Sequence, residues 1–329
     1  LEGLGTLHMP KEGTYKGDLV ASKKQGSGVF KWKDGVIYDG HWKNDMMHGK
    51  GKYITPDGFT YIGTFSENDF YKGTCTFKNE TGDYDITYSS GIISKAIIKF
   101  TDGSSYEGTC TSTKLTGSGT MLFTNGDSYF GAFVDGKRSG EGVYKWSSGD
   151  EYNGDWHEDK MDGSGEYKYS SGNYAKGTFK MNTFSDGDYY CKNDAGTYDY
   201  SVTSGTPTSV DISLNNGTTY KGDMSNGKLT GEAEIKYSNG DKYSGKVDNG
   251  QKSGSGNYYW SSGSSYKGDW SNDRMNGSGT YYYTSKSTGE RLEGTFKNNS
   301  PDGTCTYYTD STTSYKTDWS NGKCVKKYE

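Results

Sequence analysis

The chain has 329 residues, of which only 29% are hydrophobic, a formal net charge of −5 and a mean hydropathy of −0.97. Acidic and basic residues are interspersed, which argues against nucleic acid as a partner, and no apolar run approaches the ~18 residues of a transmembrane helix. So few aliphatic residues would suit a disordered chain, but 31 tyrosines and 50 glycines favour a fold whose core is built from aromatic rings.

A motif of about 23 residues recurs along the chain. A typical copy opens with Y-x-G-x-W, passes through a polar turn, continues as G-x-G-x-Y and closes on a glycine. A fixed period of this size is typical of a solenoid or array. Residues 1–14 match the second half of a copy, and the copy at 315–329 is truncated. The recognisable copies begin at Tyr15, Tyr38, Tyr61, Tyr84, Tyr106, Tyr129, Tyr152, Ala175, Tyr198, Tyr220, Tyr243, Tyr266, Leu292 and Tyr315.

Each copy predicts one β-hairpin. In the copy from Tyr129, a strand alternation of period two places Tyr129, Gly131 and Phe133 on one face. The polar stretch 134–139 predicts the turn, and 140–146 the second strand. Glycines on the aromatic face would allow a ring to approach closely; the alternative is that they only mark turns. The most regular copies give the structural frame residues Tyr38, Gly40, Trp42, Tyr152, Gly154, Trp156, Tyr266, Gly268 and Trp270.

A longer repeat contains five hairpins. Three similar segments, 28–42, 142–156 and 256–270, each begin 114 residues after the previous one, so we expect super-units starting near residues 15, 129 and 243 of one continuous array over 1–329. The third carries a three-residue insertion near 285–291. The copies from Tyr84 and Tyr198 lose the Y-x-G frame, and their second strands are more aliphatic.

Such degenerate copies suggest either a lateral surface or a change of curvature, or simply drift within a tolerant repeat. If they form a surface, the candidate partner-binding residues are Ile92, Ile93, Ile97, Ile98, Val210, Ile212 and Leu214.

The sequence contains no pattern typical of an active site. Its four histidines are scattered, no phosphate-binding loop occurs, and the G-x-G pairs are not followed by a helix. The five cysteines form no C-x-x-C pair. We therefore expect no catalytic, cofactor-binding or metal-binding residues, and no enzyme.

The motif resembles the MORN repeat (membrane occupation and recognition nexus). The best copies read YDGHWKNDMMHGKGKY, YNGDWHEDKMDGSGEY and YKGDWSNDRMNGSGTY, and the resemblance covers essentially the whole chain. It implies an all-β fold, an elongated single-sheet ribbon or solenoid of successive antiparallel hairpins. Chains made almost wholly of such repeats include radial spoke head proteins of cilia and basal-complex scaffolds of protists, so the resemblance implies an axonemal or cytoskeletal setting inside the cell.

The expected function is a non-catalytic scaffold that binds other proteins of a large assembly. A broad aromatic sheet suits protein contacts, and the truncated hairpin with Tyr315 and Trp319 is a candidate docking end, where strand addition could also join two copies of the chain. One alternative is a peripheral membrane organiser that binds anionic phospholipid, which would need a basic face. Because lysines and aspartates mix along the same strands, we do not favour it. A third possibility is an organelle assembly subunit.

Overall fold

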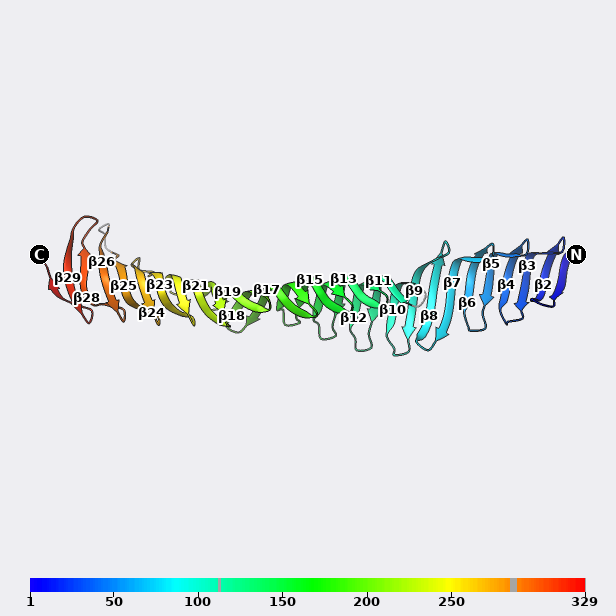
Figure 1. Cartoon of the computed structure of the whole chain (residues 1–329), viewed down its shortest axis with the longest axis horizontal. Helices are drawn as coiled ribbons and strands as arrows, with labels where there is room; N and C mark the ends of the chain where they lie inside the picture. Colours follow the sequence, from blue (N-terminus) through cyan, green and yellow to red (C-terminus); the bar gives the residue numbers. More distant parts are fainter. Residues whose placement is uncertain (112–113, 285–288, 329) are drawn as a thin grey trace. The chain divides into compact units, whose positions relative to one another are not determined.

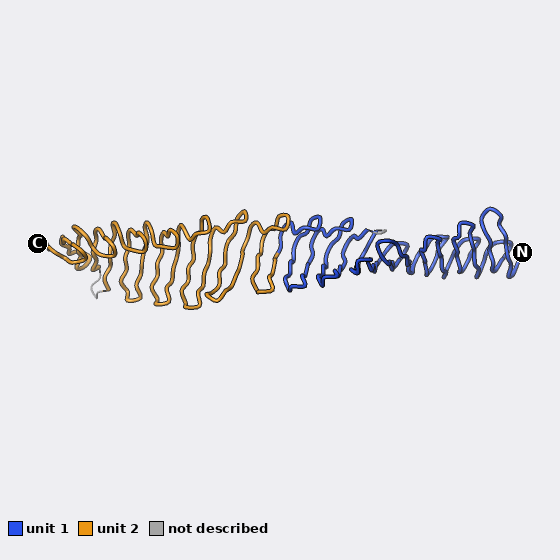
Figure 2. The backbone as a smooth tube through the Cα atoms, turned by 90° about the horizontal axis from the view of Figure 1, so that it is seen from below, with its two compact units in different colours: residues 1–165 blue, residues 166–329 orange. Residues whose placement is uncertain are grey.

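The computed structural model describes residues 1–111, 114–284 and 289–328, and every regular element in these ranges is a β-strand (Figure 1). The chain divides into two units, residues 1–165 and 166–329 (Figure 2). Within each unit, successive strands pair antiparallel into one open sheet and run across the long direction of the unit. This confirms the predicted fold of successive hairpins. Part of the insertion expected near 285–291, and the last residue of the truncated copy, lie outside the described residues.

The unit boundary falls within β15, so that β1 to β14 belong to the first unit and β16 to β30 to the second. The strands up to this boundary are β1 (Gly3–Met9), β2 (Gly13–Val20), β3 (Lys23–Trp32), β4 (Ile37–Lys43), β5 (Met46–Ile54), β6 (Thr60–Ser66), β7 (Asp69–Asn79), β8 (Gly82–Ser89), β9 (Ile92–Phe100), β10 (Ser105–Thr111), β11 (Lys114–Leu122), β12 (Ser128–Val134), β13 (Lys137–Lys145), β14 (Glu151–His157) and β15 (Lys160–Lys168).

The remaining strands are β16 (Tyr174–Lys180), β17 (Thr183–Asn193), β18 (Gly196–Thr203), β19 (Thr206–Leu214), β20 (Thr219–Ser225), β21 (Lys228–Lys236), β22 (Lys242–Asp248), β23 (Gln251–Tyr259), β24 (Ser265–Ser271), β25 (Arg274–Tyr282), β26 (Arg291–Lys297), β27 (Ser300–Pro301), β28 (Gly303–Tyr308), β29 (Ser314–Ser320) and β30 (Lys323–Lys327). Here β27 and β28 both pair with β26, as two parts of one interrupted strand.

Where the structure describes it, the turn inside a regular hairpin is shorter than the sequence predicted. Instead of the stretch 134–139, only Asp135 and Gly136 separate β12 from β13, with φ angles of 49° and 87°. Two residues with positive φ are the mark of a type I′ turn, whose twist matches that of the paired strands. The polar residues that follow therefore belong to β13, and the prediction of a long turn was wrong because polarity alone does not distinguish a turn from an exposed strand.

A register shift follows the glycine pair of the regular hairpins. In the hairpin β12–β13, Gly131 lies opposite Gly142, whereas Phe133 lies opposite Arg138. The second strand thus has extra residues at this point, which is a β-bulge that bends the pair and increases its twist. Gly140, within the bulge, has a φ of 84°.

The irregular copies remain hairpins. The copy from Tyr84 forms β8 and β9, in which the opening Tyr84 is buried and Ile86 is buried where regular copies carry the frame glycine. Tyr84 stacks on Phe77 of the preceding strand, with ring centroids 4.4 Å apart. Only two residues connect β7 to β8, so this pair of hairpins is joined more tightly than regular ones are.

The core of each unit lies on one face of its sheet. We call this the inner face, defined by Tyr129, Gly131 and Phe133, and the opposite side, on which Phe130 lies, the outer face. Tyr129 and Phe133 are buried whereas Phe130 is 62% exposed, as the predicted alternation requires. Continuous clusters of buried side chains, mostly aromatic, follow the inner face within each unit.

Candidate interaction surfaces

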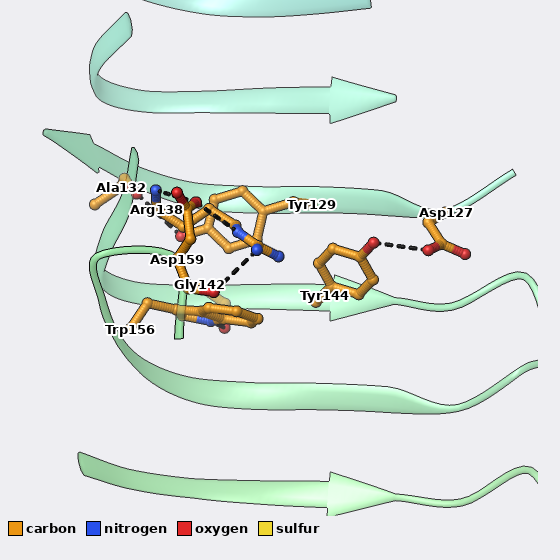
Figure 3. Close-up of polar contacts among 8 residues, drawn as sticks. All are labelled: Asp127, Tyr129, Ala132, Arg138, Gly142, Tyr144, Trp156 and Asp159. Atoms are coloured by element: carbon orange, nitrogen blue, oxygen red, sulfur yellow. Dashed lines mark hydrogen bonds and ion pairs between the residues drawn. The ribbon is translucent and has the colours of Figure 1, made fainter. Parts of the chain in front are cut away.

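The opening tyrosine of a regular hairpin lies across the two glycines of that hairpin. A Cβ on Gly142 would lie 2.2 Å from the hydroxyl oxygen of Tyr129, and one on Gly131 2.5 Å from it. The Tyr129 hydroxyl donates a hydrogen bond to the carbonyl oxygen of Ala132 at 3.0 Å (Figure 3). The glycines are therefore required by the ring above them, as the close-approach interpretation predicts.

The frame tryptophan joins its hairpin to the preceding one. Trp156 donates from Nε1 to the carbonyl oxygen of Gly142, 3.1 Å away in the previous hairpin. Its ring contacts the opening tyrosines of both hairpins edge-on, with centroids 5.4 Å from Tyr129 and 5.3 Å from Tyr152. The same bond recurs for Trp42 and for Trp270.

All nine frame residues predicted from the sequence therefore lie on the inner face. Their tyrosine and tryptophan side chains are at most 5% exposed, which makes them framework rather than partner surface. Among the predicted frame glycines, Gly40, Gly154 and Gly268 each lie beneath the tyrosine of their own hairpin.

A cation covers the aromatic rings in three hairpins that begin 114 residues apart, at Tyr15, Tyr129 and Tyr243. The Arg138 guanidinium lies 4.4 Å from the ring centroid of Trp156 and 5.0 Å from that of Tyr144. Its Nε donates to a carboxylate oxygen of Asp159, in the turn of the next hairpin, at 3.0 Å (Figure 3). Such contacts stabilise both the ring and the cation. The residues at this position are Lys24, Arg138 and Lys252.

Sequence reasoning missed this cluster. The signal was present, since a basic residue follows the opening tyrosine by nine positions in each of these three copies. Burial lowers the pKa of Lys24, against the opposing effect of the Asp45 carboxylate. Tyr144, whose ring lies beside the Arg138 guanidinium, donates a hydrogen bond from its hydroxyl to a carboxylate oxygen of Asp127 at 2.7 Å (Figure 3).

The aliphatic residues suggested as partner surface are divided between the two faces. Ile98 pairs with Tyr84 on the inner face and is fully buried, and Val210 is 2% exposed, so neither side chain can meet a partner. Ile92 and Ile97 are exposed. Their positions follow strand alternation, which the composition of the strand does not reveal. The half-buried members of the set are Ile93, Ile212 and Leu214.

The predicted docking end is partly covered by its own side chains. Tyr315 and Trp319 are half-buried in the hairpin β29–β30. The Lys327 ammonium lies 3.8 Å from the ring centroid of Tyr315, and Trp319 donates from Nε1 to the hydroxyl of Thr317 at 2.8 Å.

The outer face of the first unit carries a cross-strand row with three apolar members, which sequence reasoning did not find as a whole. Strand pairing aligns five residues from β9 to β13: Ile97, Glu107, Thr120, Phe130 and Val143. We call these five residues the outer row. Its Phe130 is 62% exposed and its Ile97 38% exposed. The sequence signal was an apolar residue directly after an opening tyrosine, a position that alternation sends to the outer face.

The second unit lacks this apolar character at the equivalent positions. Residues 114 positions further along are paired in the same order, and all of them are polar. They are Asp211, Lys221, Glu234, Ser244 and Asn257. The outer row is therefore a local property of β9–β13 and not a general feature of the repeat.

Comparison with known protein families identifies the repeat. The MORN repeat matches nine segments that together make up more than half of the chain: residues 15–37, 38–60, 106–128, 129–151, 152–174, 220–242, 243–265, 266–288 and 293–313. The chain belongs to the MORN-repeat family. The copies from Tyr61, Tyr84, Ala175, Tyr198 and Tyr315 fall outside these matches.

Among curated proteins, the chain is 31% identical over 109 residues to Alsin of Rattus norvegicus and to Alsin of Homo sapiens. These matches cover 33% of the chain but only 6% of Alsin. Among solved structures, the TCP domain of Drosophila melanogaster SAS-4, in complex with a proline-rich motif of Ana2, is 13% identical, with a TM-score of 0.24 over 60% of this chain and 90% of that one. Streptogramin B lyase is 11% identical, with a TM-score of 0.14 over 92% and 86%. TM-scores this low carry no argument about fold or function.

MORN repeats form non-enzymatic scaffolds that bind proteins or membranes. Across 1–111, 114–284 and 289–328, no group of three or more His, Cys, Asp or Glu side chains is placed to hold a metal ion. The described part of the chain also contains no helix long and apolar enough to cross a membrane. Burial raises the pKa of the inner tyrosines, to about 12 for Tyr129 and Tyr152, so their hydroxyls are neutral donors at physiological pH.

Proposed function

We propose that this MORN array is a non-catalytic scaffold that holds other proteins of a large intracellular assembly, and that the outer row is one of its binding surfaces. The observation that carries the proposal is the exposure of Phe130 and Ile97 in one cross-strand row. Exposed aromatic and aliphatic side chains that share a row suit the core of a protein interface. The equivalent row of the second unit is polar, so the feature is not required by the repeat itself.

A protein partner suits the outer row better than an anionic membrane does. Binding to anionic lipid gains about 1 kcal/mol for each lysine or arginine near the surface. In the outer row the one charged residue is Glu107, and the neighbouring Lys95 forms an ion pair with it. The row therefore presents apolar side chains beside a neutralised charge pair, rather than a basic face.

The outer row can be tested by one substitution and a matched control. Phe130→Asp places a carboxylate in the row, and Ser244→Asp places one at the equivalent position of the second unit. We expect a protein that co-purifies stoichiometrically with the wild-type chain to be lost with Phe130→Asp and retained with Ser244→Asp. Equal recovery with both variants would exclude the outer row, and a wild-type chain recovered without any stoichiometric partner would argue against the scaffold.

A second experiment separates the scaffold from the membrane alternative. We expect no salt-sensitive co-sedimentation of the purified chain with vesicles of phosphatidylserine and phosphatidylcholine. Binding at low salt that is lost at high salt would favour a peripheral membrane organiser instead.

The setting that we propose is the ciliary axoneme, in a role like that of a radial spoke head. Support for this setting comes from the resemblance to chains made almost wholly of MORN repeats, and therefore rests on analogy within the family. Fluorescent tagging in ciliated cells should place the chain along the axoneme, and exclusion from cilia would favour another assembly, such as one in an organelle.

A further inference from the structure

One ring is missing from the inner aromatic layer of the second hairpin. Eight copies match the MORN repeat over a full 23 residues, from the opening tyrosine onward. In seven of them the residue 17 positions after that tyrosine is aromatic: Trp32, Phe123, Trp146, Tyr169, Tyr237, Trp260 and Tyr283. In the copy from Tyr38 this residue is Thr55.

In five of these seven copies this ring packs on an aromatic residue two positions before it, and in the other two that residue is Met121 or Ile235. Ring centroids are 4.4 Å apart for Phe30 and Trp32, 4.7 Å for Tyr258 and Trp260, and 4.9 Å for Tyr281 and Tyr283. The equivalent of this first ring in the second hairpin is Tyr53, which has Thr55 where the others have an aromatic neighbour. Tyr53 therefore lacks the partner ring that the fold provides elsewhere.

A hollow of about 320 Å³ lies at this place. Its aromatic lining surrounds the missing position: the Tyr61 and Phe70 rings are 5.2 Å apart, and those of Phe65 and Phe70 5.1 Å apart. Aromatic pairs in such offset or edge-on arrangements are favourable beyond the area they bury. The complete lining is Met47, Tyr53, Thr55, Tyr61, Phe65, Asn68 and Phe70.

Two carboxylates lie within two positions, along the sequence, of residues that line the hollow. Asp57 is exposed in the connection that begins at Thr55, and Glu67 is exposed in the turn that also contains Asn68. The Asp34 carboxylate is close enough to raise the pKa of Tyr53, in addition to the larger effect of burial. An aromatic residue that enters the hollow from a basic segment would gain complementary charge at its rim.

We propose that this hollow receives a tryptophan or tyrosine side chain from a basic segment of a partner protein, which completes the aromatic layer in trans. The inference rests on the proposed function of the chain as a protein scaffold, and it adds a second binding site on the inner face of the first unit. The ring of the partner takes the position that the chain fills with its own Trp32 and Trp260 in other hairpins.

The test uses the purified full chain and the peptide acetyl-Lys-Trp-Lys-amide, labelled with 5-fluorotryptophan and followed by ¹⁹F NMR. We expect saturable binding to the wild-type chain. Filling the hollow from within by Thr55→Tyr should weaken this binding at least about tenfold, because the ring positions coincide. Thr55→Leu fills the space with an aliphatic group and should weaken it similarly, which keeps the test valid if the tyrosine variant does not fold.

Matched controls separate the effect of the hollow from those of an added ring elsewhere, of the peptide's tryptophan and of the peptide's charge. Thr124→Tyr adds a ring at an exposed position outside the hollow and should leave the affinity unchanged. Acetyl-Lys-Ala-Lys-amide and acetyl-Glu-Trp-Glu-amide should both bind more weakly than the basic tryptophan peptide. Equal binding of the alanine peptide, or undiminished binding to the Thr55 variants, would overturn the proposal.

The peptide assay contains no partner protein, so its failure is distinct from a failure of the scaffold proposal. Phe130→Asp changes the outer face and should leave peptide binding unaltered. Loss of peptide binding with Phe130→Asp would instead show that the peptide binds elsewhere, which also counts against the hollow.

Discussion

The contact between Tyr129 and its two glycines explains the most constant part of the repeat. The ring lies so close to Gly131 and Gly142 that a methyl group on either would overlap it. In exchange, the ring is completely buried and its hydroxyl has a carbonyl acceptor. A single-layer sheet has no second layer to cover its core, and large rings lying flat on glycine provide that cover.

We predict that Gly142→Ala destabilises the chain by about 2–4 kcal/mol, since neither the ring nor the paired backbone can move far. Urea unfolding followed by circular dichroism measures the loss. In a Tyr129→Ala background the same change should cost much less, because the overlapping ring is absent. Equal costs in the two backgrounds would show that the ring is not what requires the glycine.

The tyrosine hydroxyls also predict a pH dependence. Burial raises the pKa of Tyr38, Tyr129 and Tyr266 to about 12, above the ordinary value of about 10 in an unfolded chain. Below pH 10 both states keep the proton and stability is complete; between pH 10 and 12 only the unfolded state ionises, so stability falls as pH rises.

We therefore expect the urea midpoint to be lower at pH 11 than at pH 9. The fall should be smaller in Tyr129→Phe, which has no hydroxyl to ionise at that position. A midpoint independent of pH over this range would contradict the assigned cause.

At the scale of the element, the opening tyrosine packs on its own hairpin, and the frame tryptophan joins that hairpin to the preceding one. The indole of Trp156 bonds to the preceding hairpin through Gly142. Other copies carry a different residue at this position; Phe65, for example, contacts Tyr38 edge-on at 5.0 Å, much as Trp156 contacts Tyr129. Phenylalanine can thus replace the packing of tryptophan but not its hydrogen bond.

We predict that Trp156→Phe costs about 1–2 kcal/mol, the value of leaving a buried carbonyl without its donor. Because the same bond recurs at Trp42 and Trp270, their phenylalanine variants should lose a similar amount in urea unfolding. A loss below about 0.5 kcal/mol in all three would mean that the bond adds little to the join between hairpins.

The hairpins were more predictable than the turns between their strands. Period-two alternation around Tyr129 indicated both strands and the face that is buried, because the signal is local. The extent of the turn at Asp135 and Gly136 depends on positive φ angles, which Asp and Asn residues accept as well as Gly. Composition therefore suggested a turn three times too long, whereas the chain needed only two residues there.

At the scale of the whole molecule, the hairpins of a unit pair with their neighbours in sequence throughout the residues that the structure describes. Repeat arrays of this kind respond locally to a perturbation. We predict that Trp156→Phe lowers amide hydrogen-exchange protection in β13 to β15 and leaves β3 to β5 unchanged. A uniform loss from β1 to β15 would instead show that the first unit unfolds as one cooperative block.

The candidate binding sites were less predictable than the fold. Ile97 was found from its aliphatic surroundings, but Ile98 was selected by the same criterion and is buried. The outer row becomes visible only when strand register aligns Ile97 with Phe130. The hollow forms because Thr55 is smaller than the aromatic residues at equivalent positions. A threonine gives no signal of its own in the sequence, and its significance is clear only after the equivalent rings have been located in the structure.

The cation that recurs every five hairpins limits how such a chain can grow or shrink by duplication. Arg138 is matched to two features of the following hairpin, the indole of Trp156 and the carboxylate of Asp159. Deleting the hairpin from Tyr152, or inserting another kind of hairpin before it, would separate the Arg138 guanidinium from the Trp156 ring and the Asp159 carboxylate. Copying or deleting a block of 114 residues would again place a basic residue of one hairpin beside a tryptophan and an aspartate of the next. The shortest genetic step that preserves every junction is therefore the five-hairpin block, and gains or losses of that size are the length variants that related chains should show.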